Sequence, residues 1–192
     1  MSVKDSAPVV HPTSAADWGS WLAEHHASSG GVWVRIDDRT GRDGRMAYED
    51  AVCEALCWGW IDGQTRSSAE EGSQIWFTRR QARSAWAATN KARVARLEAE
   101  GRLQPAGVAM IEAAEANGMW VVLDGPEAGI EPDELAAALD ASPAAREFWD
   151  SLPRSARKFA LTQVAMARRP ETQTARIAKI VEQSAAGVRP DR

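Results

Sequence analysis

The chain has 192 residues, of which 44% are hydrophobic and 26% charged, and this ordinary globular mixture excludes a disordered or fibrous protein. The length suits one domain with a substantial core, or one domain followed by a helical module. The formal net charge of −4 argues against indiscriminate nucleic-acid binding by the whole molecule.

The N-terminal residues show no targeting signal. Residues 1–13 contain Pro8 and Pro12 and lack both a basic start and an apolar signal core, so we expect a flexible N-terminus. No apolar run in the sequence approaches the roughly 18 residues needed to span a bilayer. The sequence therefore predicts a cytoplasmic protein without membrane insertion.

Helix and strand signals alternate in the first part of the chain. Ser14 is a favourable N-cap, and an apolar pattern of helical spacing follows it until Ser28. Residues 32–36 are β-branched at alternate positions, which predicts a strand. A polar loop is expected over 37–45, and residues 48–58 return to helical periodicity.

The next segments complete a predicted α+β domain over 14–118. Residues 60–66 and 74–79 are expected to form strands that pair as an antiparallel hairpin, because their connection is short. Helices are expected over 84–101 and 105–117. The sequence thus predicts a small antiparallel sheet of about three strands packed with helices.

The last third of the chain is predicted to be entirely helical. Residues 119–131 contain two glycines and a proline and are the best candidate linker. An all-helical C-terminal module is expected over 132–187. Its predicted helices cover residues 132–140, 143–152, 155–168 and 171–186.

Nine tryptophans stand out in the composition, and several of them lie near polar residues in the centre of the chain. A buried tryptophan adds apolar area to a core, but an aromatic wall can also line a ligand pocket. Glu49 falls inside the apolar arc of its helix, and buried polar groups need partners or a cavity. The candidate ligand-binding residues are Glu49, Trp58, Trp60, Asp62, Trp76, Thr78, Arg79, Trp86 and Asn90.

Five of these residues are expected to converge on one cavity beside the sheet. Trp60 and Asp62 lie two apart on a predicted strand and share a face, and Trp86 and Asn90 lie four apart on a predicted helix. Packing of that helix on the sheet would bring them together with Trp76. Glu49 and Asp62 could form an acid-base pair, but an ordinary turn residue at Asp62 and ordinary ion pairs with nearby arginines are the better explanation of these carboxylates.

The cysteines indicate neither a disulfide nor a metal site. Cys53 and Cys57 are the only two, and they lie four apart in one predicted helix, where a disulfide has poor geometry. A structural zinc site needs four ligands, and no others are spaced to join them. We expect two reduced thiols, no metal and no cofactor.

Six short motifs follow one another in a characteristic order and spacing. They are Trp-Gly-Trp-Ile-Asp-Gly at 58–63, Phe-Thr-Arg-Arg at 77–80, Ser-x-Trp-x3-Asn at 84–90, Gly-Arg-Leu-x-Pro-x-Gly at 101–107, Ala-Ala-Arg-x-Phe-Trp at 144–149, and the run 158–180. Together they resemble the YdeI/OmpD-associated family over about Trp18 to Ala186. One departure is Arg80, where that family's pattern leads us to expect a proline.

The resemblance implies a bacterial protein linked to protection against bacteriocins or antimicrobial peptides and to stress tolerance. It implies no established reaction and supplies no catalytic residue. The leading hypothesis is a non-enzymatic protective protein that binds a small molecule or peptide in a Trp-lined pocket. One alternative is an enzyme that uses Glu49 or Asp62 for acid-base chemistry in the same pocket. Another is an interaction module in which the basic residues of 79–102 dock on nucleic acid or an acidic partner, although nucleic acid fits the overall charge poorly.

Overall fold

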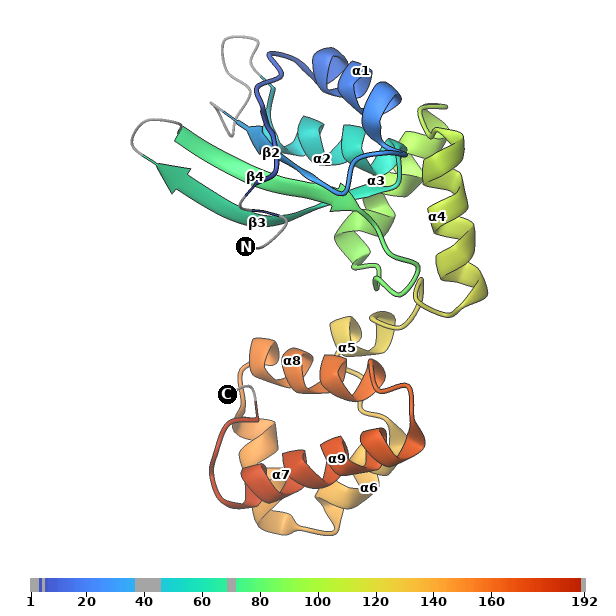
Figure 1. Ribbon diagram of the computed structural model, residues 1–192. Helices are drawn as coiled ribbons and strands as arrows, with labels where there is room; N and C mark the ends of the chain where they lie inside the picture. Colours follow the sequence, from blue (N-terminus) through green and yellow to red (C-terminus); the bar gives the residue numbers. More distant parts are fainter. Residues whose placement is uncertain (1–3, 5, 37–45, 69–71, 191–192) are drawn as a thin grey trace. The chain divides into compact units, whose positions relative to one another are not determined.

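The fold is known from a computed structural model, in which two compact units are distinguished (Figure 1). The described residues are 4, 6–36, 46–68 and 72–190, so the expected loop over 37–45 lies outside them. The first unit consists of Met1–Ser84 and Thr89–Asn117, and the second of Ala85–Ala88 and Gly118–Arg192.

A four-stranded sheet forms the centre of the first unit, in the order β1-β2-β4-β3. Strand β4 (Gly72–Arg79) pairs in antiparallel orientation with both β2 (Val32–Arg35) and β3 (Trp60–Ser68). Strand β1 (Val9–Val10) runs parallel to β2 at one edge. The predicted α+β class is confirmed, with four strands instead of three.

Strand β1 lies in the segment for which a flexible N-terminus was expected. A strand of two residues cannot show the alternation that identifies longer strands, and its neighbouring prolines indicated irregular chain. The Trp33 amide donates to the Pro8 carbonyl at 3.0 Å, and the Trp33 indole N–H donates to the Lys4 carbonyl at 2.9 Å. Part of segment 1–13 is therefore hydrogen-bonded to the sheet.

Helices α1 and α2 cover one face of the sheet (Figure 1). Ser14 caps α1 as predicted, because its side chain accepts a hydrogen bond from the Asp17 amide. Trp18 is fully buried, packs edge-on against Phe77 at 5.4 Å, and donates its indole N–H to the Ala51 carbonyl of α2. The helices of this unit are α1 (Ala15–His25), α2 (Tyr48–Cys57), α3 (Ala88–Ala99) and α4 (Pro105–Ala116).

Strand register assigns the aromatic residues to opposite faces of the sheet. Asp62 lies opposite Phe77, and directly opposed residues of antiparallel strands point to the same side. Trp76 is the neighbour of Phe77 and therefore points to the other face, where it packs against Trp33 at 5.4 Å. Gly31 has a φ of +152°, and a Cβ there would lie 2.1 Å from the Trp76 ring. Glycine thus allows the close approach of that ring.

The second unit is a helical module with its own core. Its buried residues include Leu135, Trp149 and Leu161, which are almost fully inaccessible to solvent. None of the helices within the described ranges is both long and apolar enough to cross a membrane. The helices of the second unit are α5 (Asp124–Ala128), α6 (Asp133–Asp140), α7 (Pro143–Ser151), α8 (Arg154–Ala165) and α9 (Pro170–Ala185).

Residues 119–131, for which a linker was expected, contain helix α5 and pack within the second unit. Trp120 contacts Trp86 at 5.0 Å, and Glu131 accepts two hydrogen bonds from Arg146, each of 2.8 Å. The Trp149 indole N–H donates to the same carboxylate at 2.7 Å. Glycine and proline were the signal for a linker here, whereas the residues that this segment contacts are distant in sequence and left no local signal.

Candidate functional site

A polar cluster joins helices α2 and α3 of the first unit. The Glu49 cluster, as we call it, consists of Glu49 and Cys53 on α2 and Asn90, Arg93 and Arg96 on α3. Arg93 donates hydrogen bonds to both carboxylate oxygens of Glu49. Its Nε lies 3.0 Å from Oε1 and 3.2 Å from Oε2, and its Nη2 lies 2.6 Å from Oε2. The third nitrogen, Nη1, donates to the Asn90 side-chain oxygen at 2.8 Å. Asn90 therefore fixes the orientation of the arginine that holds Glu49.

The electrostatics of this cluster keep Glu49 ionised. The hydrogen bonds from Arg93 lower the pKa of the Glu49 carboxyl group, and the same bonds raise the pKa of Arg93. The Glu49 side chain remains 48% exposed, and a second arginine, Arg96, lies 3.5 Å away. A carboxylate held by two guanidinium groups is a poor proton carrier near neutral pH, because its conjugate acid is disfavoured.

The thiol of Cys53 belongs to the same cluster but is not activated by it. Cys53 is 2% exposed, and its Sγ lies 3.5 Å from a Glu49 oxygen and 2.9 Å from Arg96 Nη2. Burial and the Glu49 charge raise the pKa of the Cys53 thiol, and burial raises that of Cys57 to about 11. Both cysteines are free. Among the described residues, no group of three or more metal-binding side chains is close enough to hold an ion.

Asp62 has separate partners from Glu49. The Tyr48 hydroxyl donates to the Asp62 carboxylate at 2.6 Å, and burial together with that bond raises the pKa of Tyr48 to about 12. Arg80 is 5% exposed, and burial lowers its pKa to about 10, while the charge of Asp62 opposes that shift. The guanidinium thus stays charged at neutral pH. The two carboxylates considered as an acid-base pair therefore have different hydrogen-bond partners: Tyr48 for Asp62 and Arg93 for Glu49.

Three more candidates tie the sheet to the turn after α1. The buried Trp60 donates its indole N–H to the His26 carbonyl at 3.2 Å. The Thr78 hydroxyl donates to the Gly30 carbonyl at 2.9 Å, and Arg79 donates to the Ala27 carbonyl at 2.9 Å. The Trp58 ring packs at a tilt of 42° against His26, with ring centroids 4.7 Å apart, and its buried indole N–H has no hydrogen-bond partner among the described residues.

The expectation that five residues share one cavity is wrong. Trp76 faces away from Asp62, because it neighbours the residue that opposes Asp62 in the register. Trp86 precedes α3 and packs on Trp120 in the second unit, whereas Asn90 lies on α3 in the first. The prediction assumed a helix running from residue 84, but α3 begins at Ala88. The four-residue spacing between Trp86 and Asn90 is therefore not helical.

Sequence reasoning missed the two arginines at the centre of the cluster. Asn90, Arg93 and Arg96 recur every three residues and so share one side of α3, which is the signal that could have identified them. The sequence placed Glu49 inside the apolar arc of its helix, and the structure explains this polar residue there by its ion pairs with Arg93 and Arg96. A hollow of about 380 Å³ opens over this cluster, lined by Glu49, Thr89, Ala92, Arg93 and Arg96.

Comparison with protein families assigns the two parts of the chain separately. Residues 10–110 match the family described as a domain of unknown function, DUF8412. The chain belongs to this family. Residues 129–187 match a second family, described as bacteriocin-protection, YdeI or OmpD-associated. No curated protein and no solved structure matches the chain at a significant level.

The second match confirms the resemblance stated from the motifs and limits its extent. The resemblance was expected from Trp18 to Ala186, but the bacteriocin-protection family matches only residues 129–187. The sheet and the Glu49 cluster lie in the part that DUF8412 covers. Arg80 stands where the family pattern led us to expect a proline. Its side chain is buried, and the charge of the Asp62 carboxylate stabilises its guanidinium group.

Proposed function

We propose that this chain protects bacteria against bacteriocins or related antimicrobial peptides, and that it acts by binding a peptide or small molecule instead of by catalysis. The observation that carries the protective role is the match of residues 129–187 to the bacteriocin-protection family. The family description supports the protective role. The mode of action and the site are inferences from the side chains of the first unit.

The Glu49 cluster is our candidate for the binding site. It has the guanidinium groups of Arg93 and Arg96 around the Glu49 carboxylate, with Arg96 also 4.0 Å from a Glu100 oxygen, and Glu49 and Arg96 are 48% and 52% exposed. A ligand that carries a carboxylate, such as the C-terminus of a peptide, would be attracted to such an arrangement. Of the nine residues selected from the sequence, we keep Glu49, which lines the hollow, and Asn90, which orients Arg93.

Two observations disfavour the alternative hypotheses. The enzyme hypothesis requires a carboxylate with a pKa near neutrality, and Arg93 lowers the pKa of Glu49 instead. The nucleic-acid hypothesis requires a row of cations over residues 79–102, but three arginines of this segment already have carboxylate partners: Arg93 and Arg96 pair with Glu49, and Arg102 pairs with Glu54 and Glu100. Paired cations release fewer counterions on binding phosphate.

A challenge experiment tests this proposal. A sensitive bacterial host without the protein is complemented with the wild-type chain, with Arg96→Ala, or with the control Arg83→Ala, and the inhibitory concentrations of a bacteriocin panel are measured. Arg96 lines the hollow, whereas Arg83 is exposed and donates to Gln81 outside it. We expect R83A to protect like the wild type and R96A to protect poorly at equal protein level. Equal protection by both variants would reject the Glu49 cluster as the site, and no protection by the wild type would reject the function.

A further inference from the structure

Charge is strongly segregated along the second unit. Residues 118–152 contain eight acidic side chains and one basic side chain, whereas residues 153–192 contain nine basic and three acidic ones. The overall charge of −4 therefore conceals a basic segment that consists of α8, α9 and the C-terminal tail. Residues 79–102, by comparison, contain seven basic and two acidic side chains.

Many acidic groups of the second unit already have partners inside it. Glu131 is bound by Arg146, and Glu127 pairs with Lys158 at 2.8 Å and also accepts a hydrogen bond from the Ala88 amide. Lys179 on α9 makes no ion pair with any described residue. Helix α9 carries Arg176 and Lys179 together with Glu171 and Glu182, so the excess of positive charge in this segment comes from α8 and from the residues that flank α9.

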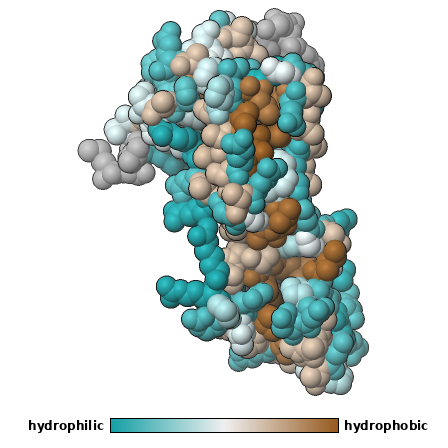
Figure 2. Space-filling model, turned by 90° about the vertical axis from the view of Figure 1, so that its right-hand side faces the viewer, coloured by the Kyte–Doolittle hydropathy of each residue, from teal (hydrophilic) through white to brown (hydrophobic). Residues whose placement is uncertain are grey.

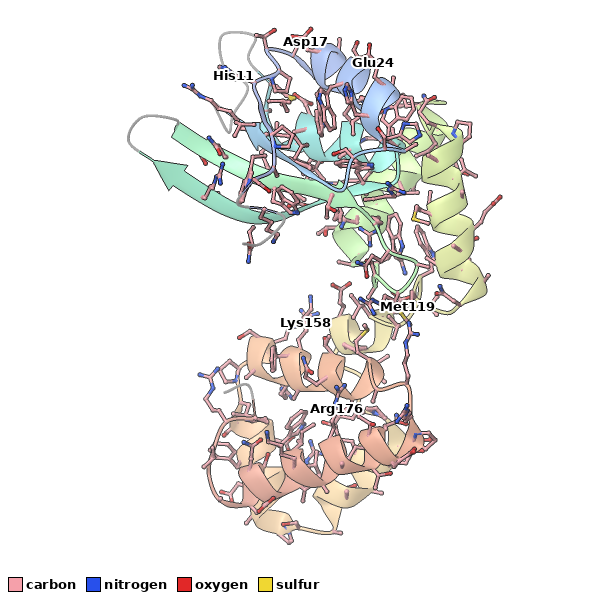
Figure 3. The ribbon with its side chains drawn as sticks, in the orientation of Figure 1. His11, Asp17, Glu24, Met119, Lys158 and Arg176 are labelled. Atoms are coloured by element: carbon pink, nitrogen blue, oxygen red, sulfur yellow. The ribbon has the colours of Figure 1, made fainter. Side chains whose placement is uncertain are left out.

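A groove runs between α8 and α9 where this charge meets apolar surface. Its volume is about 300 Å³, and its lining consists of Phe159, Ala160, Gln163, Arg176, Lys179, Ile180, Gln183 and Pro190. Ala160 and Ile180 are almost buried and form the floor, while Phe159 is 47% exposed. Arg176 reaches from α9 to the Gln163 carbonyl of α8 (Figure 3). That bond holds one end of its guanidinium in place and leaves other N–H groups as donors.

Apolar surface is also visible on the outside of the second unit. Figure 2 shows hydrophobic residues at the surface of this unit. Separately, the Phe159 side chain is 47% exposed beside the groove that it lines. An apolar strip bordered by cations is the arrangement that receives an amphipathic helix with acidic flanks. The apolar face of such a helix would cover Phe159 and Ile180, and its carboxylates would meet Arg176 and Lys179.

We propose that the α8–α9 groove binds an acidic amphipathic helix of a partner protein. A nucleic acid fits less well, because single strands need several aromatic platforms along a track of cations, and this groove offers one aromatic side chain on an aliphatic floor. The proposal concerns the second unit and does not depend on the Glu49 cluster. The groove therefore adds a docking surface to a chain whose ligand site is proposed elsewhere.

Binding to the full-length chain tests this proposal. The probe is a fluorescent helical peptide in which leucines occupy one face and glutamates flank it, and the controls are the same peptide with lysine for glutamate and a single-stranded oligonucleotide. We expect the acidic peptide to bind and the lysine peptide not to bind. Lys179→Glu should weaken binding about tenfold by replacing attraction with like-charge repulsion, and Phe159→Ala should weaken it by loss of apolar contact.

The matched control is Arg168→Glu, which makes the same charge reversal at an exposed position between α8 and α9 but outside the groove lining. Arg168→Glu should bind the acidic peptide almost as the wild type does, with circular dichroism confirming that all variants are folded. Equal weakening by K179E and R168E would indicate unspecific charge attraction and overturn the proposal. So would equal affinity for the two peptides, tighter binding of the oligonucleotide, or no binding of the acidic peptide.

Discussion

Gly107 lies where helix α4 makes its closest approach to the end of α2. A Cβ at this position would lie 2.3 Å from the Cys57 carbonyl oxygen and 2.9 Å from the Leu56 carbonyl oxygen. Both atoms belong to the backbone and cannot rotate away, so Gly107→Ala must push α4 off α2 by about 1 Å to restore ordinary contact. Overpacking of this kind costs about 1–3 kcal/mol, and the better helix propensity of alanine returns at most ~1 kcal/mol.

Gly19→Ala is the matched control in the same unit. Gly19 also lies inside a helix, α1, but the atom that its Cβ would meet at 2.7 Å is the carboxylate oxygen of Glu54, at the end of a flexible side chain. In urea unfolding followed by circular dichroism, we expect G107A to lose about 1–2 kcal/mol and G19A to change by less than ~1 kcal/mol. A G107A variant as stable as G19A would refute the argument that backbone contact fixes the position of α4.

Other predictions concern ionisation and thiol chemistry. Hydrogen bonds from Arg146 lower the pKa of Glu131, so its contribution to stability is present above the unfolded-state value near 4.5 and is lost as the pH falls through the folded-state value. Glu131→Gln should therefore cost about 2 kcal/mol at pH 7 and make the acid limb of the stability profile shallower, and an unchanged acid limb would contradict this origin. Cys53 and Cys57, buried with raised pKa values, should react with a thiol reagent only slowly in the native chain and stoichiometrically after unfolding. Fast reaction of the two thiols in the native chain at pH 7 would contradict the burial of Cys53 and Cys57. Tyr48→Phe removes the hydrogen bond to Asp62 and should cost about 1 kcal/mol in urea unfolding, and no loss would show that this bond is not stabilising.

The sequence predicted the elements that rest on local patterns. Ser14 caps its helix because a short polar side chain at that position satisfies an amide that the helix leaves unpaired. The strands at 32–36, 60–66 and 74–79 were identified from β-branched and aromatic residues, and each is present within a few residues of the expected bounds. These signals depend on near neighbours in the chain.

Features that depend on distant pairing could not be predicted in the same way. The face on which Trp76 lies follows from the opposition of Asp62 and Phe77, and no local pattern fixes that register. Trp86 was placed on a helix that begins only at Ala88, and its partner Trp120 is in another part of the chain.

For Glu49, the sequence predicted that a partner was needed but not which residues supply it. Its place inside an apolar arc indicated that a partner or a cavity was needed, and the structure supplies Arg93 and Arg96 from a helix some 40 residues later. The charge segregation of the second unit was readable directly from the sequence, but its meaning appeared only when α8 and α9 were seen to form a groove.

The most direct test of the proposed function is to observe the ligand and the site at once. A bacteriocin against which the chain protects cells is added to the isotopically labelled protein of 20.9 kDa, backbone amide and arginine side-chain NMR spectra are recorded, and the peptide is then examined by mass spectrometry. The proposal predicts that signals of Glu49, Asn90, Arg93 and Arg96 shift on binding and that the peptide is recovered intact. Shifts confined to other parts of the chain, or recovery of a cleaved or modified peptide, would contradict it.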